Sequence, residues 1–68
     1  MSDSLANALP KEIERVEEVL KIYESVGPPG LFASTMIKQS LQNAKMAMAE
    51  GDVAGMIVTY RDLKDIDT

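Results

Sequence analysis

The first residues to consider for chemistry are five glutamates between positions 12 and 24 of this 68-residue sequence. Carboxylates can transfer protons or hold metal ions, and helical bundles that bind two metals combine glutamates with a Glu-x-x-His repeat. The sequence contains no histidine and no cysteine, which excludes that repeat, zinc sites built on Cys or His, and cysteine nucleophiles. Most of these glutamates also lie outside the row of apolar residues in their segment, so we predict that they form a solvated acidic face. Its members are Glu12, Glu14, Glu17, Glu18 and Glu24.

Hydroxyl groups are the other candidate nucleophiles, and none of them has a histidine base in this sequence. Ser34 and Lys38 have the i, i+4 spacing of neighbours on a helix, but such pairs are frequent by chance. The Gly-Pro-Pro-Gly segment at residues 27–30 lacks both the pattern and the N–H donors of a phosphate-binding loop. We therefore predict that the chain is not an enzyme and has no catalytic, cofactor-binding or metal-binding residues.

The overall charge argues against nucleic acid and membrane surfaces as partners. Seven lysines and arginines against 11 aspartates and glutamates give a net charge of -4, whereas phosphate backbones and anionic lipids select basic patches. No apolar run approaches the roughly 20 residues that cross a bilayer, and the first residues lack a basic region followed by an apolar core. Because there is also no cysteine, the sequence favours a cytoplasmic protein.

Apolar residues at helical spacing predict three helices, at about residues 10–26, 31–50 and 53–64. Pro10 fits the first turn of a helix, and we predict that residues 1–8 before it form a flexible arm. The prolines at residues 27–30 must end the first helix in a stiff corner. Gly51 fits the left-handed backbone conformation that often ends a helix, and Asp52 fits the N-cap of the next helix. This short turn therefore predicts an antiparallel hairpin of the second and third helices.

These elements predict an all-α fold, with a single three-helix domain over residues 9–65 in which the first helix folds back across the hairpin. One hydrophobic core in a chain of this size contributes only about 3–5 kcal/mol to the free energy of unfolding. Without disulfides or metals, further stability must come from helix packing or self-association. We therefore expect a homodimeric bundle in which helices of both chains share the core, and the close approach of a second chain is one possible reason for Gly55 inside a helix. The expected core residues are Ile13, Val16, Leu20, Tyr23, Ile37, Leu41, Ala44, Met48, Val53, Ile57, Tyr60 and Leu63.

Five apolar residues outside the main stripes are candidates for an intermolecular surface. They are Phe32, Met36, Met46, Ile22 and Val58. Flexible methionine side chains suit adaptable protein surfaces, and the small core of one chain favours an interface over scattered exposure. We predict a small protein–protein interaction module, a regulatory or accessory protein that docks by a helix face on a partner that the sequence does not identify. Its best anchors are Phe32, Met36 and Met46.

Two other functions stay open at this stage. The acidic first helix is also a feature of an inhibitor that mimics nucleic acid and occupies a basic site, although a net charge of -4 is modest for that role. A small-ligand binder would need a concave pocket with converging polar groups, and the sequence offers no constellation for one. Residues 31–49 carry two lysines and no acid, which favours pairing with the acidic first helix, within one chain or across a dimer.

Two resemblances accompany these patterns. The alanines, the Gly-Asp turn and the tyrosine of residues 44–60 resemble a tetratricopeptide helix junction, but no second copy follows at the repeat period and solenoids need several copies. We interpret this likeness as convergent helix-turn-helix chemistry. Residues 22–28, 36–37, 51–53 and 60–63 together resemble small uncharacterised helical proteins of bacteria and their prophages. That resemblance implies a bacterial, cytoplasmic and non-enzymatic protein and assigns no site residue.

Overall fold

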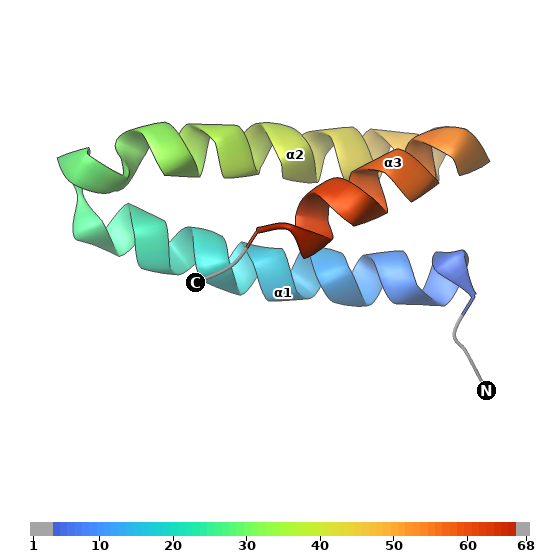
Figure 1. The fold of residues 1–68 in the computed structure, drawn as a ribbon, viewed down its shortest axis with the longest axis horizontal. Coiled ribbons are helices and arrows are strands. Elements are labelled where there is room, and N and C mark those ends of the chain that lie inside the picture. The colour runs from blue at the N-terminus through green and yellow to red at the C-terminus, as the bar shows by residue number, and fades with distance from the viewer. Residues whose placement is uncertain (1–3, 67–68) are drawn as a thin grey trace.

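The computed structural model describes residues 4–66, which form helices packed side by side (Figure 1). The element order is α1 (Leu5–Val26), the 3-10 turn η1 (Pro28–Gly30), α2 (Leu31–Glu50) and α3 (Val53–Lys64). Each of the three α-helices contacts the other two, and residues 4–66 contain no strand. This confirms an all-α fold of three packed helices. None of these helices is both long and apolar enough to cross a membrane.

The first helix begins at Leu5, five residues before the predicted start. The predicted flexible arm is therefore wrong for residues 5–8, which are helical, while residues 1–3 lie outside the described part of the chain. Pro10 lies inside the helix, where its missing N–H costs one backbone hydrogen bond. Leu9 has no exposed surface, and Leu5 packs against the same core one helical turn earlier. Burial of these two leucines offsets the lost bond, a tertiary effect that local helix signals do not show.

The corner between α1 and α2 depends on two glycines that have different tasks. Gly27 ends α1 at a φ of 85° and a ψ of -147°, a positive-φ conformation open to glycine but distinct from the left-handed helical one. Pro28 begins η1, and the last residue of this turn, Gly30, is buried. A Cβ atom on Gly30 would collide with the backbone carbonyl oxygen of Tyr23. Only glycine lets the chain pass this closely over the last turns of α1.

The turn between α2 and α3 is the one that the sequence predicts. Gly51 is left-handed, with a φ of 66° and a ψ of 27°, and the Asp52 carboxylate accepts a hydrogen bond from the backbone N–H of Gly55 at 3.0 Å. A Cβ atom on Gly55 would lie 3.3 Å from the Cβ of Ala47 and would also crowd Asp52. Gly55 therefore serves the packing of α3 against α2 of the same chain, and no second chain is needed to explain it. From this turn α3 runs back alongside α2 (Figure 1).

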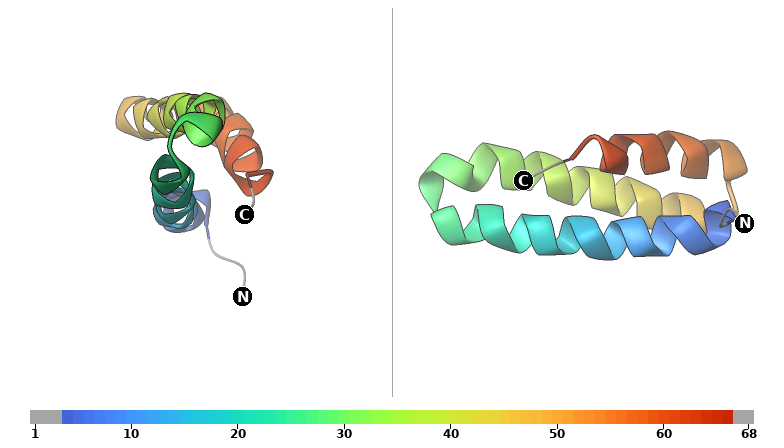
Figure 2. Two further views of the ribbon diagram at one scale, coloured as in Figure 1. Left: turned by 90° about the vertical axis from the view of Figure 1, so that its left-hand side faces the viewer. Right: turned by 60° about the horizontal axis from the view of Figure 1, so that its bottom comes forward.

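The core lies where the three helices face one another, and the end-on view in Figure 2 shows α1, α2 and α3 arranged around it. Half of the predicted core residues are buried: Ile13, Val16, Ile37, Leu41, Ala44 and Leu63. Others are partly buried against that core: Leu20, Tyr23, Met48 and Tyr60. Four buried apolar residues complete it although they were not on the predicted list: Leu9, Val19, Ala47 and Met56.

Two predicted core residues are wrong, both in α3. Val53 is 62% exposed and Ile57 is 47% exposed, because α3 is rotated so that Met56, Thr59 and Leu63 face inward. The buried hydroxyl of Thr59 is satisfied, since it donates a hydrogen bond to the Gly55 carbonyl at 2.8 Å. Apolar residues lie on several sides of the first half of α3, so the sequence pattern does not show which side faces the core.

The three helices differ in length, and this difference leaves part of the bundle uncovered. Helix α1 has 22 residues and α2 has 20, whereas α3 has only 12. In Figure 1, α3 lies in front of the other two helices and ends near their middle. At a rise of about 1.5 Å per residue, the difference from α2 amounts to about 12 Å of helix. The halves of α1 and α2 nearest the corner therefore have no third helix over them.

Candidate functional site

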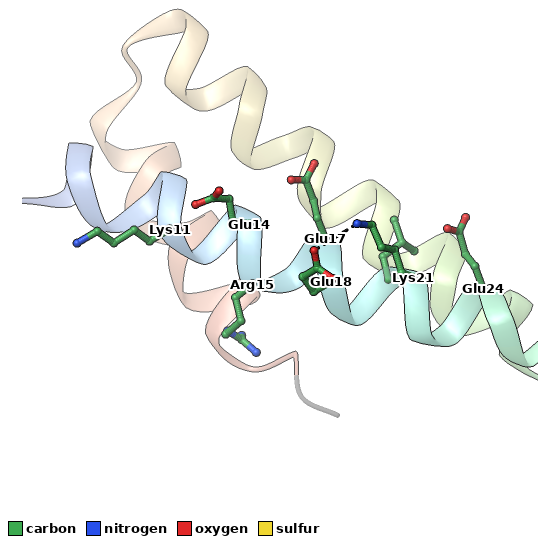
Figure 3. A pocket seen from close by; sticks show the side chains of 8 residues that line it. Lys11, Glu14, Arg15, Glu17, Glu18, Lys21 and Glu24 are labelled. Atoms are coloured by element: carbon green, nitrogen blue, oxygen red, sulfur yellow. Dashed lines mark hydrogen bonds and ion pairs between the residues drawn. The ribbon is translucent and has the colours of Figure 1, made fainter.

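The predicted acidic face is an open depression along the outer side of α1 (Figure 3). All of its lining side chains project from this one helix, and they include both acidic and basic groups. They are Lys11, Glu14, Arg15, Glu17, Glu18, Leu20, Lys21 and Glu24. A surface formed by a single helix does not surround a small ligand as an enclosed pocket does.

Four of the five predicted glutamates form an ion pair within the chain. The pairs are Glu12–Arg15, Glu17–Lys45, Glu18–Lys21 and Glu24–Lys38. The Nζ–Oε2 distances are 3.0 Å for Glu17–Lys45 and 3.1 Å for Glu24–Lys38, and these two pairs join α1 to α2. The predicted pairing of the acidic helix with the lysine-bearing helix is thus confirmed within one chain. Among residues 4–66, Glu14 is the one member of this set without an ion-pair partner.

The described part of the chain assembles neither a carboxylate metal site nor a Ser–Lys catalytic pair. No three acidic side chains of residues 4–66 are grouped so that they could hold a metal ion. Ser34 is buried and its hydroxyl donates to the Leu31 carbonyl at 2.9 Å, while the Lys38 ammonium pairs with Glu24. The structure therefore does not bring Ser34 and Lys38 together as a nucleophile and its base.

The surface that α3 leaves uncovered is an apolar groove between α1 and α2, which we call the corner groove. Its lining comes from α1, from α2 and from the residues after α3: Tyr23, Phe32, Ala33, Met36, Ile37, Asp65 and Ile66. It continues into a hollow that shares four of these residues and adds Ser40 and Asp62. Phe32 is 78% exposed and Met36 is 57% exposed, although both are large and apolar. Unlike the acidic face, this groove has walls from different elements.

Two further apolar residues extend the α1 rim of the corner groove. Arg15 marks the side of α1 that faces α3, because its guanidinium donates hydrogen bonds to the carbonyls of Leu63 at 2.8 Å and Ile66 at 2.9 Å. Ile22 and Val26 follow Arg15 by two and three helical turns, so they lie on nearly the same side of α1, beyond the end of α3. Both are more than half exposed. The rim thus presents four large apolar side chains to solvent: Ile22, Val26, Phe32 and Met36.

The remaining interface candidates lie elsewhere. Met46 lies on the side of α2 that carries Lys45 and is half exposed. Val58 is exposed on α3, as are Val53 and Ile57, and we call these three residues together the α3 outer face. The structure therefore places two of the five predicted interface residues, Phe32 and Met36, in the lining of one groove. Ile22 lies on the neighbouring side of α1, and Met46 and Val58 lie on separate surfaces.

Sequence reasoning missed three polar residues that matter at this end of the bundle. No prediction named Arg15, which joins α1 to the end of α3. No prediction named Asp62 or Asp65 either, yet both line the hollow that continues the corner groove. Only the predicted shortness of the third helix gave a signal that the groove exists, and no local pattern marks these three side chains.

In comparisons with known proteins, no family model, no curated protein and no solved structure matches the chain. The resemblances to a tetratricopeptide junction and to small helical proteins of bacteria therefore remain predictions. Function has to be inferred from the two exposed apolar surfaces, the corner groove and the α3 outer face.

Proposed function

We propose that this chain is a small protein–protein interaction module, not an enzyme, and that its corner groove docks a helix of another protein. The observation that carries the proposal is that α3 ends early and leaves Phe32, at 78% exposed, beside an uncovered groove between α1 and α2. Clusters of large apolar side chains on the surface of a small protein are often binding sites. Two packed helices also present the ridges and grooves that receive the apolar face of a third helix.

The test is site-specific cross-linking followed by direct binding. A photo-reactive amino acid replaces Phe32, and the same amino acid replaces the exposed Lys21 on the outer side of α1 as the control. We expect position 32, and not position 21, to link to an amphipathic helical segment of another protein. That segment, made as a synthetic peptide, should bind the purified chain, and the substitution Met36→Asp should weaken its binding. If the peptide does not bind, or binds Met36→Asp equally well, the proposal fails.

We also propose self-association through the α3 outer face, as a second and separate property. It is supported by the exposure of Val53, Ile57 and Val58, three large apolar side chains on one short helix. A second copy packed on this face would bury them and give the shared core of the expected homodimeric bundle.

Light scattering on a sizing column across a concentration series tests the dimer. We expect twice the mass of one chain, and the mass of one chain for the variant Ile57→Asp. The variant Met46→Glu is the matched control, because Met46 lies on α2 and has no part in the α3 outer face. A single-chain mass at every concentration would exclude the dimer and leave the proposal for the corner groove untouched.

The two alternative functions gain less support from the site. A nucleic-acid mimic needs a row of available carboxylates, and four of the five glutamates in the acidic face are paired with cations of the same chain. A small-ligand binder needs an enclosed polar site, and the depression on α1 is open along its length.

A further inference from the structure

The charged side chains of the corner groove and its adjoining hollow are acidic only. Asp62 and Asp65 lie where the groove meets the end of α3, and neither lysine nor arginine lines the groove or the hollow. Neither aspartate has a side-chain hydrogen bond or ion pair among residues 4–66. The acidic face of α1 differs, since most of its glutamates are paired. The groove and its adjoining hollow therefore combine an apolar floor with two carboxylates near the end of α3 that have no ion-pair partner among residues 4–66.

We infer that the helix docked in the corner groove is amphipathic and basic, an inference that rests on the function proposed above. Its apolar face lies on Tyr23, Met36 and Ile37, and its lysines or arginines meet Asp62 and Asp65. Opposite charges at an interface steer the encounter and disfavour partners of the wrong charge. Because both carboxylates lie at the α3 end of the groove, they also select one orientation, in which the basic end of the partner adjoins α3.

The length of the uncovered surface sets the length of this partner helix. About 12 Å of α2 extends past the span that α3 covers, which corresponds to about eight helical residues. Two to three turns of helix therefore fill the groove, with apolar residues at i, i+3 or i+4, and i+7 toward the floor. The basic residues belong to the turn next to Asp62 and Asp65.

The inference is tested with two synthetic helical peptides of leucine and alanine that differ only in the charge of their last turn. One carries two lysines there and the other carries two glutamates. Each is titrated into the purified chain, and binding is followed by the backbone amide NMR signals of Met36, Ile37 and Ile66. We expect the lysine peptide to bind about fivefold more tightly at low salt, and the difference to shrink as salt screens the charges.

Two double variants test which carboxylates cause the preference for the lysine peptide. Asp62→Asn with Asp65→Asn should remove the preference for lysine, whereas Glu14→Gln with Glu50→Gln should keep it. Both changes raise the net charge equally, and neither Glu14 nor Glu50 lines the groove or its adjoining hollow.

Equal binding of both peptides in the groove would overturn the inference and leave helix docking intact. If neither peptide shifts the groove signals, helix docking itself is overturned, and the inference fails with it. If the groove signals change with the concentration of the chain alone, and the mass doubles, a second copy occupies the groove and the basic partner is excluded.

Discussion

The guanidinium of Arg15 donates a hydrogen bond at 2.8 Å to the backbone carbonyl of Leu63, which lies 48 residues further along the chain. A second bond, at 2.9 Å, reaches the carbonyl of Ile66. The last carbonyls of a helix lack partners within it and carry partial negative charge, so a cation beside them is favourable. Arg15 thereby fixes the end of α3 against α1 and sets the place where the corner groove begins.

Replacing Arg15 with methionine should lower the free energy of unfolding by about 1–2 kcal/mol, because the end of α3 loses a charged donor and Glu12 loses its ion-pair partner. The measurement is urea unfolding followed by circular dichroism. Lys21→Met is the control, since the Lys21–Glu18 pair is exposed and should contribute less than about 0.5 kcal/mol. Equal losses in the two variants would mean that the contact of Arg15 with α3 is not stabilising.

A second prediction concerns the inward face of α3. Leu63→Asp should abolish helicity at micromolar concentration, because Leu63 has no exposed surface and an unpaired charge would be buried in its place. Ile57→Asp should keep the helical circular dichroism signal, because Ile57 is 47% exposed. If Ile57→Asp lost the helical signal and Leu63→Asp kept it, α3 would be rotated the other way and Ile57 would face the core.

The corner predicts a contrast between two glycines that receive the same substitution. Gly30→Asn should cost about 1–3 kcal/mol or more, because a Cβ atom there meets the backbone of Tyr23, which cannot move aside as a side chain can. Gly51→Asn should cost only a few tenths of a kcal/mol, since asparagine tolerates the left-handed conformation and nothing lies near that Cβ position. Thermal unfolding of the two variants measures both, and similar melting temperatures would contradict the close packing at Gly30.

Much of the fold could be predicted because its boundaries are set by local chemistry. The turn at Gly51 and Asp52 depends on a left-handed residue followed by an N-cap, and both are visible in the sequence. The start of α1 at Leu5 was missed, because it depends on the packing of Leu5 against the core that the three helices share. The rotation of α3 was missed for the opposite reason: with apolar residues such as Val53 and Met56 on different sides, local pattern favours no single face.

The candidate site was predictable only in part. Phe32 and Met36 could be identified as surplus apolar residues because they lie outside the main stripe of their helix. The groove beside them depends on how far α3 reaches along α1, which the Arg15 contact fixes across 48 residues of chain. The placement of Asp62 and Asp65 at the groove follows from the same tertiary contact, so no local signal could indicate it.

The tight corner at η1 has a consequence for the thermodynamics of docking. Two prolines restrict the backbone there, and Gly30 is held against the last turns of α1, so both walls of the corner groove are preorganised in the free chain. Ordering a flexible residue costs about 1–2 kcal/mol of conformational entropy. When a partner helix enters this groove, the conformational entropy that is lost therefore belongs mainly to the partner, and this chain loses little. A larger share of the contact energy then remains as binding affinity than if the groove had to be ordered on binding.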